Sequence, residues 1–97
     1  MLFTILATDK PNAVALRADS RPAHLDYLKS FGTAVVAAGP VLQDDGETPA
    51  GSLLVVDMAD RAEVERFCAG DPYAKAELFE SVAIKPYRLA ILNPPAQ

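Results

Sequence analysis

The pattern of hydrophobic and polar positions along the chain predicts four β-strands. Apolar and β-branched runs bounded by Gly, Pro, Asp or Asn are typical of strands, and this chain has four, at 2–8, 33–38, 51–57 and 81–92. Gly39-Pro40 is expected to end the second strand, and Pro86 marks a bulge or an edge position in the last. Turn residues at 43–50 predict a hairpin between the second and third strands.

The helix-like pattern predicts two main helices. We expect the first over residues 22–31, because apolar residues recur there at helical spacing and Pro22 suits a first turn. Residues 9–19 begin with a Lys-Pro breaker pair and are expected to form a connection with one helical turn. A capping box followed by apolar residues on one face predicts the second helix over 60–70. Asp71-Pro72 is expected to open a further short turn.

The order strand, helix, strand, strand, helix, strand predicts a ferredoxin-like βαββαβ fold. This is an α+β architecture in which both helices lie on one face of an antiparallel sheet. The first strand is apolar on both sides, with Phe3 and Ile5 on one and Leu2 and Leu6 on the other. Two helices cover only one face, so we expect a second copy to cover the other and form a homodimer, as a dimeric α+β arrangement.

Composition narrows the possible partners and the domain count. The chain of 97 residues has 9 Lys plus Arg against 13 Asp plus Glu and no basic stripe, so we expect no nucleic-acid partner. It has no apolar run approaching the roughly 20 residues of a membrane helix, so we expect no membrane partner. The length predicts a single domain over 1–97 with a tail at 93–97.

Cys68 is the sole cysteine, which leaves no intramolecular disulfide and no thiolate cage for a metal. A reducing, cytoplasmic location fits this cysteine usage. Between Phe67 and Ala69 on an apolar helix face, the thiol is expected to be buried and inert. One histidine and scattered acids make no compact ligand set, so we expect no metal site and no cofactor.

His24 is the natural candidate for acid-base chemistry, because it is the only histidine and histidine ordinarily titrates near neutral pH. In the predicted helix it lies near the N-terminus, where the helix dipole favours the neutral ring that a general base requires. The alternative is a histidine at the surface or core edge with no chemical role. Spacing alone does not decide between the two.

Asp71 precedes Pro72, so it suits the N-cap of a short helical turn. It could also orient the His24 ring and stabilise its protonated form, and the two roles are compatible. Candidate substrate contacts come from Pro40 and Gly51, where the backbone could approach a ligand, and from the hydroxyls of Ser52 and Tyr73.

Four short segments in order resemble the YciI-like (YCII-related) family: Arg21-Pro22-Ala23-His24-Leu25, Gly39-Pro40, Gly51-Ser52 and Asp71-Pro72-Tyr73. The resemblance covers nearly the whole chain. It implies a dimeric α+β barrel, a pocket built around His24 and Asp71, and Ser52 in the pocket lining. Glu77 stands where many relatives have a glycine, so substrate contacts there are expected to differ.

These residues favour a cofactor-independent enzyme in which His24 moves a proton on a small aromatic or enolisable substrate and Asp71 orients it. This proton transfer would give isomerisation or elimination, and the resemblance implies elimination on substituted hydroquinones among the relatives. A non-catalytic small-molecule-binding or accessory domain is the alternative, and a structural dimerisation module is the third possibility. A buried His24 with no cavity beside it would favour the third.

Overall fold

Four antiparallel strands form one sheet in the computed structural model, which describes residues 1–96. The strands are β1 (Leu2–Asp9), β2 (Val35–Leu42), β3 (Pro49–Asp57) and β4 (Phe79–Tyr87). Their order across the sheet is β2-β3-β1-β4, so β1 pairs with both β3 and β4. Of the predicted tail 93–97, residues 93–96 contain no helix or strand and residue 97 lies outside the described residues.

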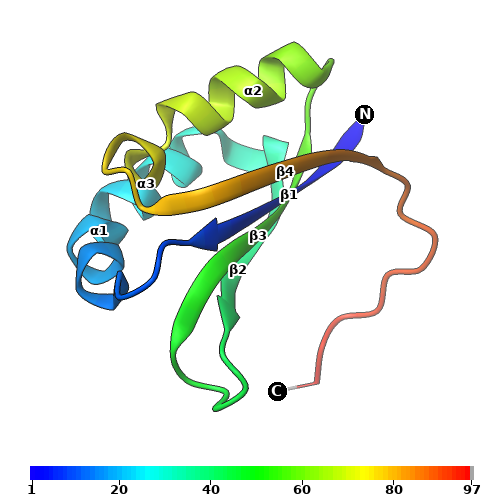
Figure 1. Ribbon diagram of the computed structural model, residues 1–97. Coiled ribbons are helices and arrows are strands. Elements are labelled where there is room, and N and C mark those ends of the chain that lie inside the picture. The colour runs from blue at the N-terminus through cyan, green and yellow to red at the C-terminus, as the bar shows by residue number, and fades with distance from the viewer. Residues whose placement is uncertain (97) are drawn as a thin grey trace.

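Three helices, α1 (Val14–Ser30), α2 (Arg61–Gly70) and α3 (Pro72–Lys75), lie on one side of this sheet (Figure 1). A 3-10 turn, η1 (Gly32–Ala34), leads from α1 into β2. The predicted order βαββαβ and the ferredoxin-like α+β fold are confirmed, with α3 added directly after α2. Among residues 1–96, no helix combines the length and the apolar character needed to cross a membrane.

Helix α1 begins at Val14, so the predicted start at Pro22 was wrong and Pro22 lies inside the helix. A proline there cannot donate the backbone hydrogen bond of its position. The helix continues because Arg17 before the proline and His24 after it are both buried against the rest of the fold. The burial of these side chains thus outweighs the free-energy cost of the hydrogen bond that is lost at Pro22. His24 lies more than two turns from the helix start, so the expected effect of the helix dipole on its ring was also wrong.

The strand boundaries differ from the prediction most at the ends of β2 and β4. Strand β2 continues through Gly39-Pro40, which were expected to end it. It lies at the sheet edge, where strands tolerate proline. Strand β4 ends at Tyr87 rather than at residue 92. Pro86 lies within this second edge strand, as predicted. The hairpin is confirmed, since β2 pairs with β3 in antiparallel register.

The hydrophobic core lies between the helices and one face of the sheet. Its central members alternate along the strands and meet α2, which accounts for their burial: Phe3, Ile5, Leu54, Val56, Val64 and Phe67. On the opposite face, Leu6 and Leu53 lie directly across from each other on β1 and β3. Their side chains are 46% and 47% exposed. The helices therefore leave a second apolar face open.

Candidate active site

One face of α1 lines a cavity of about 340 Å³ between this helix and the β2–β3 hairpin. Arg17, Arg21, His24 and Leu28 follow at spacings of four, three and four residues, which places them on one side of a helix. The hairpin provides the opposite wall through Ala38, Gly39, Pro40, Pro49, Ser52 and Leu54, and Tyr73 completes the lining from α3. Ligand pockets span roughly 300–1,000 Å³, so this cavity suits a small molecule.

His24 and Asp71 form a buried hydrogen bond across the fold. The Nδ1 atom of His24 is 2.8 Å from Oδ1 of Asp71, and the same Oδ1 accepts the backbone N–H of Tyr73 at 2.9 Å. Asp71 therefore caps α3 and contacts the imidazole with one oxygen. A carboxylate beside Nδ1 favours the tautomer in which Nδ1 carries the proton, which leaves the Nε2 lone pair as the acceptor.

The Nε2 atom of His24 is not engaged by the protein. It has no hydrogen-bond partner among residues 1–96. In this part of the chain, every fully buried side-chain nitrogen or oxygen does have a partner. Nε2 is therefore accessible, and His24 belongs to the cavity lining. An oriented imidazole with a free nitrogen at a cavity wall can accept a proton from a bound molecule and return it.

Tyr73 packs against the ring of His24 and the guanidinium of Arg17. The ring centroids of His24 and Tyr73 are 3.8 Å apart with planes 14° from parallel, and Cζ of Arg17 lies 4.6 Å from the Tyr73 centroid. Burial raises the pKa of the Tyr73 phenol, although the charges of Arg17 and Arg21 act in the other direction. Tyr73 therefore holds the histidine ring in place as a neutral side chain.

A buried ion pair lies beside the His24–Asp71 hydrogen bond, and the sequence patterns did not reveal it. Arg17 binds Asp9 through two hydrogen bonds, from Nε at 2.7 Å and from Nη2 at 2.9 Å. Both side chains are 6% exposed. Burial opposes the guanidinium charge, but the Asp9 carboxylate outweighs it and raises the pKa of Arg17. The stripe of Arg17, Arg21 and His24 would have pointed to Arg17, had α1 been predicted to start at residue 14.

Ser52 connects this ion pair to the cavity. Nη2 of Arg17 donates to Oγ of Ser52 at 2.8 Å. A hydroxyl that accepts a bond from arginine keeps its own hydrogen free to donate. Ser52 is buried and lines the cavity, so its O–H is available to an oxygen atom of a bound molecule.

The structure places two of the other three candidate substrate contacts at the cavity and the third elsewhere. Pro40 and Tyr73 line the cavity, whereas Gly51 does not. A side chain at Gly51 would collide with the carbonyl oxygen of Ala7 on β1, so the close approach at this glycine is to a neighbouring strand.

Glu77 is exposed, outside the cavity lining, and has a φ of 59°. This left-handed backbone conformation favours glycine, so the backbone alone gives a reason for glycine at this position.

Histidine, cysteine and carboxylate side chains do not gather into any group of three or more that could hold a metal ion within residues 1–96. Asp9 and Asp71 instead each bind a basic side chain. The donor set of the cavity therefore suits proton transfer and hydrogen bonding to an organic molecule.

Comparisons with known proteins place this geometry in context. The chain is 30% identical over 95 residues to Protein YciI of Escherichia coli O6:H1, covering 91% of this chain and 97% of the relative. It resembles the structure of 5-chloro-2-hydroxyhydroquinone dehydrochlorinase from Burkholderia phenoliruptrix, in complex with 2,5-dihydroxybenzoquinone, with a TM-score of 0.85 and 31% identity. That match covers 93% of this chain and 96% of the other.

More distant structures share the fold alone. An antibiotic biosynthesis monooxygenase matches with a TM-score of 0.53 at 15% identity, covering 92% of this chain and all of the other. The family model of the YCII-related domain matches residues 1–88, which include every residue of the cavity lining. The chain therefore belongs to the YCII-related domain family.

Proposed function

We propose that the protein is a cofactor-independent enzyme that eliminates or isomerises a small, hydroxylated aromatic or enolisable substrate by proton transfer through His24. The observation that carries this proposal is the 2.8 Å contact between His24 Nδ1 and Asp71 Oδ1, which leaves Nε2 unbound on a residue that lines the cavity. A histidine with only a structural role would not need an unbound ring nitrogen beside a cavity of ligand size.

Each polar group at the cavity has a role in this proposal. Nε2 of His24 takes a proton from the substrate, and the Asp71 carboxylate stabilises the imidazolium that forms. Ser52 donates its hydroxyl hydrogen to a substrate oxygen, while Arg17 holds Ser52 in place. Tyr73 and Pro40 contribute lining surface. The apolar remainder of the wall keeps the site dry, which strengthens these electrostatic interactions.

Elimination from a hydroxylated ring needs no more than these groups. His24 removes a proton from one ring hydroxyl, and the ring carbon that bears the leaving group takes up a proton to give the keto tautomer. Loss of a second hydroxyl proton then expels the leaving group, chloride in the case of a chlorinated ring. The net change is loss of H⁺ and Cl⁻, so no external oxidant or reductant takes part. The name of the dehydrochlorinase relative supports this reaction class.

The test uses two measurements on the purified protein. Chloride release from 5-chloro-2-hydroxyhydroquinone measures elimination, and solvent deuterium exchange at the ring carbons of 2,5-dihydroxybenzoquinone measures proton transfer without a leaving group. We expect catalysis of at least one, and a loss of roughly 10²- to 10⁴-fold in His24→Ala. Wild-type rates equal to those of His24→Ala in both assays would contradict an acid-base role.

A binding domain is the second candidate, and the cavity itself favours it over a purely structural role. Saturable binding of 2,5-dihydroxybenzoquinone without turnover or exchange would support this alternative.

The open sheet face supports the further proposal of a homodimer in which a second copy covers Leu6 and Leu53.

A further inference from the structure

The charges around the cavity differ from those of the chain as a whole. The protein has a net charge of -4, yet the cavity lining contains three basic side chains, those of Arg17, Arg21 and His24. Within the described residues 1–96, no aspartate or glutamate lines it. The lining of this cavity is therefore basic in a protein that is acidic as a whole.

Two of these three basic side chains already have buried carboxylate partners. Asp9 neutralises Arg17, and Asp71 contacts His24. Arg21 is different, because no carboxylate among residues 1–96 lies within ion-pair distance of it. Arg21 is therefore the one arginine of the cavity lining without a carboxylate partner among residues 1–96.

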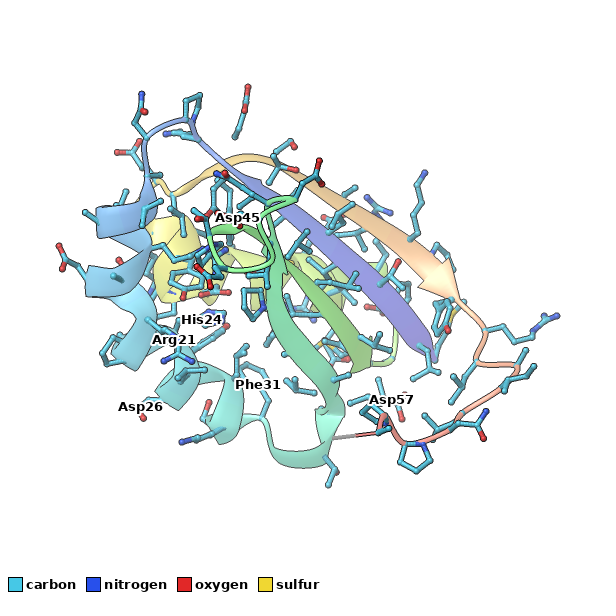
Figure 2. The ribbon with its side chains drawn as sticks, turned by 90° about the horizontal axis from the view of Figure 1, so that it is seen from below. Arg21, His24, Asp26, Phe31, Asp45 and Asp57 are labelled. Atoms are coloured by element: carbon cyan, nitrogen blue, oxygen red, sulfur yellow. The ribbon has the colours of Figure 1, made fainter. Side chains whose placement is uncertain are left out.

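The position of Arg21 on α1 directs its charge toward the site. Arg21 lies one helical turn from His24, on the side of α1 that lines the cavity. Asp19 and Asp26, the two acids of α1, lie on the opposite side by helical spacing. Figure 2 shows Asp26 pointing away from the sheet, whereas Arg21 and His24 lie on the side that faces it.

We propose that the substrate is an anion whose charged oxygen pairs with Arg21 while its reacting part lies at His24. This inference rests on the proposed function for the role of His24, but the charge preference belongs to Arg21 alone. It selects acidic enols, hydroxyquinones and phenols with a low pKa over neutral molecules of the same shape. The guanidinium also stabilises negative charge that develops on oxygen when His24 removes a proton.

The test compares two probes of one skeleton by equilibrium titration calorimetry. 2,5-Dihydroxybenzoquinone is a vinylogous acid and is anionic at neutral pH, whereas its dimethyl ether, 2,5-dimethoxybenzoquinone, is neutral. We expect the anion to bind more tightly, and its affinity to fall as ionic strength rises. Arg21→Gln should weaken binding of the anion roughly three- to tenfold and leave the affinity for the ether unchanged. Arg21→Lys should keep most of the anion's affinity.

The matched control is Arg66→Gln, which makes the same charge change at an exposed position of α2 outside the cavity lining. Equal affinity for the two probes, no measurable binding of the anion, or equal losses in Arg21→Gln and Arg66→Gln would overturn the proposal. Because neither probe carries a chloride to lose, binding does not depend on turnover. Arg21-dependent binding without catalysis would contradict the proposed function alone, and catalysis indifferent to Arg21 would contradict this inference alone.

Discussion

The Nδ1 atom of His24 and the Oδ1 atom of Asp71 lie 2.8 Å apart, although 47 positions separate the two residues in the chain. The same carboxylate oxygen accepts the backbone N–H of Tyr73. One atom thus joins the middle of α1 to the start of α3. The capping role and the chemical role of Asp71 can be separated only by a substitution that keeps the shape and removes the charge.

Asp71→Asn is that substitution. Asparagine caps helices about as well as aspartate, so we expect the free energy of unfolding to change by no more than about 1 kcal/mol. The imidazolium loses its negative partner, so turnover should fall roughly 10²- to 10⁴-fold. Denaturant unfolding and the chloride-release assay measure the two effects. An Asp71→Asn protein with full activity would reduce Asp71 to a cap.

The double variant His24→Ala with Asp71→Asn tests whether the two residues act as one unit. Members of one catalytic unit are strongly non-additive, so the double variant should be hardly slower than either single variant. Losses that multiply would show that the two side chains act separately.

Removing one partner of the buried Arg17–Asp9 pair should cost more stability than removing one partner of an exposed ion pair. Asp9→Asn leaves the Arg17 charge buried without its partner, and we expect it to lower the free energy of unfolding by about 3–5 kcal/mol. The control is Asp57→Asn, which removes the partner of the Met1 amino group at a site that is 60% exposed. That change should cost less than about 1 kcal/mol. Urea titrations that give equal costs would contradict the prediction.

Glu77→Gly should stabilise the protein without affecting the cavity. A left-handed backbone costs an ordinary residue about 1–2 kcal/mol, and the extra flexibility of glycine in the unfolded chain takes back roughly 0.5–1 kcal/mol. A net gain of about 0.5–1 kcal/mol is therefore expected in denaturant unfolding, with unchanged binding of 2,5-dihydroxybenzoquinone. Glu77→Ala removes the carboxylate but keeps the strained backbone, so it should show no gain. A change in ligand affinity would show that residue 77 does contact the bound molecule.

A charge on the open sheet face should separate the two copies of the proposed homodimer. Leu6→Lys places an ammonium group opposite Leu53, so we expect sedimentation to shift from twice the mass of the 10.3 kDa chain to a single chain. Leu16→Lys is the control, because Leu16 is 38% exposed on α1 and outside that face. A wild-type protein that sediments as one chain at micromolar concentration would rule out the dimer.

The reactivity of Cys68 should be low at neutral pH and rise steeply in base. Burial, together with the charges of Asp71 and Glu65, raises the pKa of its thiol from 9.0 to about 11. The thiolate that reacts with iodoacetamide is then about 100-fold scarcer than for a free thiol near pH 8. A native labelling rate equal to the rate in denaturant would contradict this.

The same shift in pKa gives a sign for the pH dependence of stability. Because the folded-state pKa of Cys68 lies above its ordinary value, its contribution to stability is complete below about pH 9. That contribution is lost as the pH rises toward 11.

The sequence predicted the fold well where local signals and tertiary packing agree. The unbroken apolar run at 2–8 identified β1. The capping box at Asp60 identified the start of α2, where the Asp60 side chain accepts the Glu63 backbone N–H at 2.9 Å. The prediction failed at Pro22, because no local rule shows that burial of the residues on both sides of a proline will carry a helix through it.

The wrong start of α1 also prevented Arg17 and Asp9 from being recognised as part of the candidate site. With α1 expected to start at residue 22, Arg17 lay in a supposed connection and had no reason to face His24. Asp9 looked like the polar end of a strand, since nothing local links it to an arginine eight positions away. His24 and Asp71 were recognisable as residues, but their 2.8 Å contact depends on how α1 packs against α3.

The spacing of Arg17, Arg21 and His24 on a single helix makes the site sensitive to chain length in a way that substitutions do not reveal. Each residue of an α-helix turns the chain by about 100°. Removing or adding one residue between Arg17 and His24 would leave a helix of nearly the same composition, but Arg17 could no longer reach Asp9 while His24 reached Asp71. We therefore expect this stretch of α1 to tolerate exchanges of side chains far better than insertions or deletions.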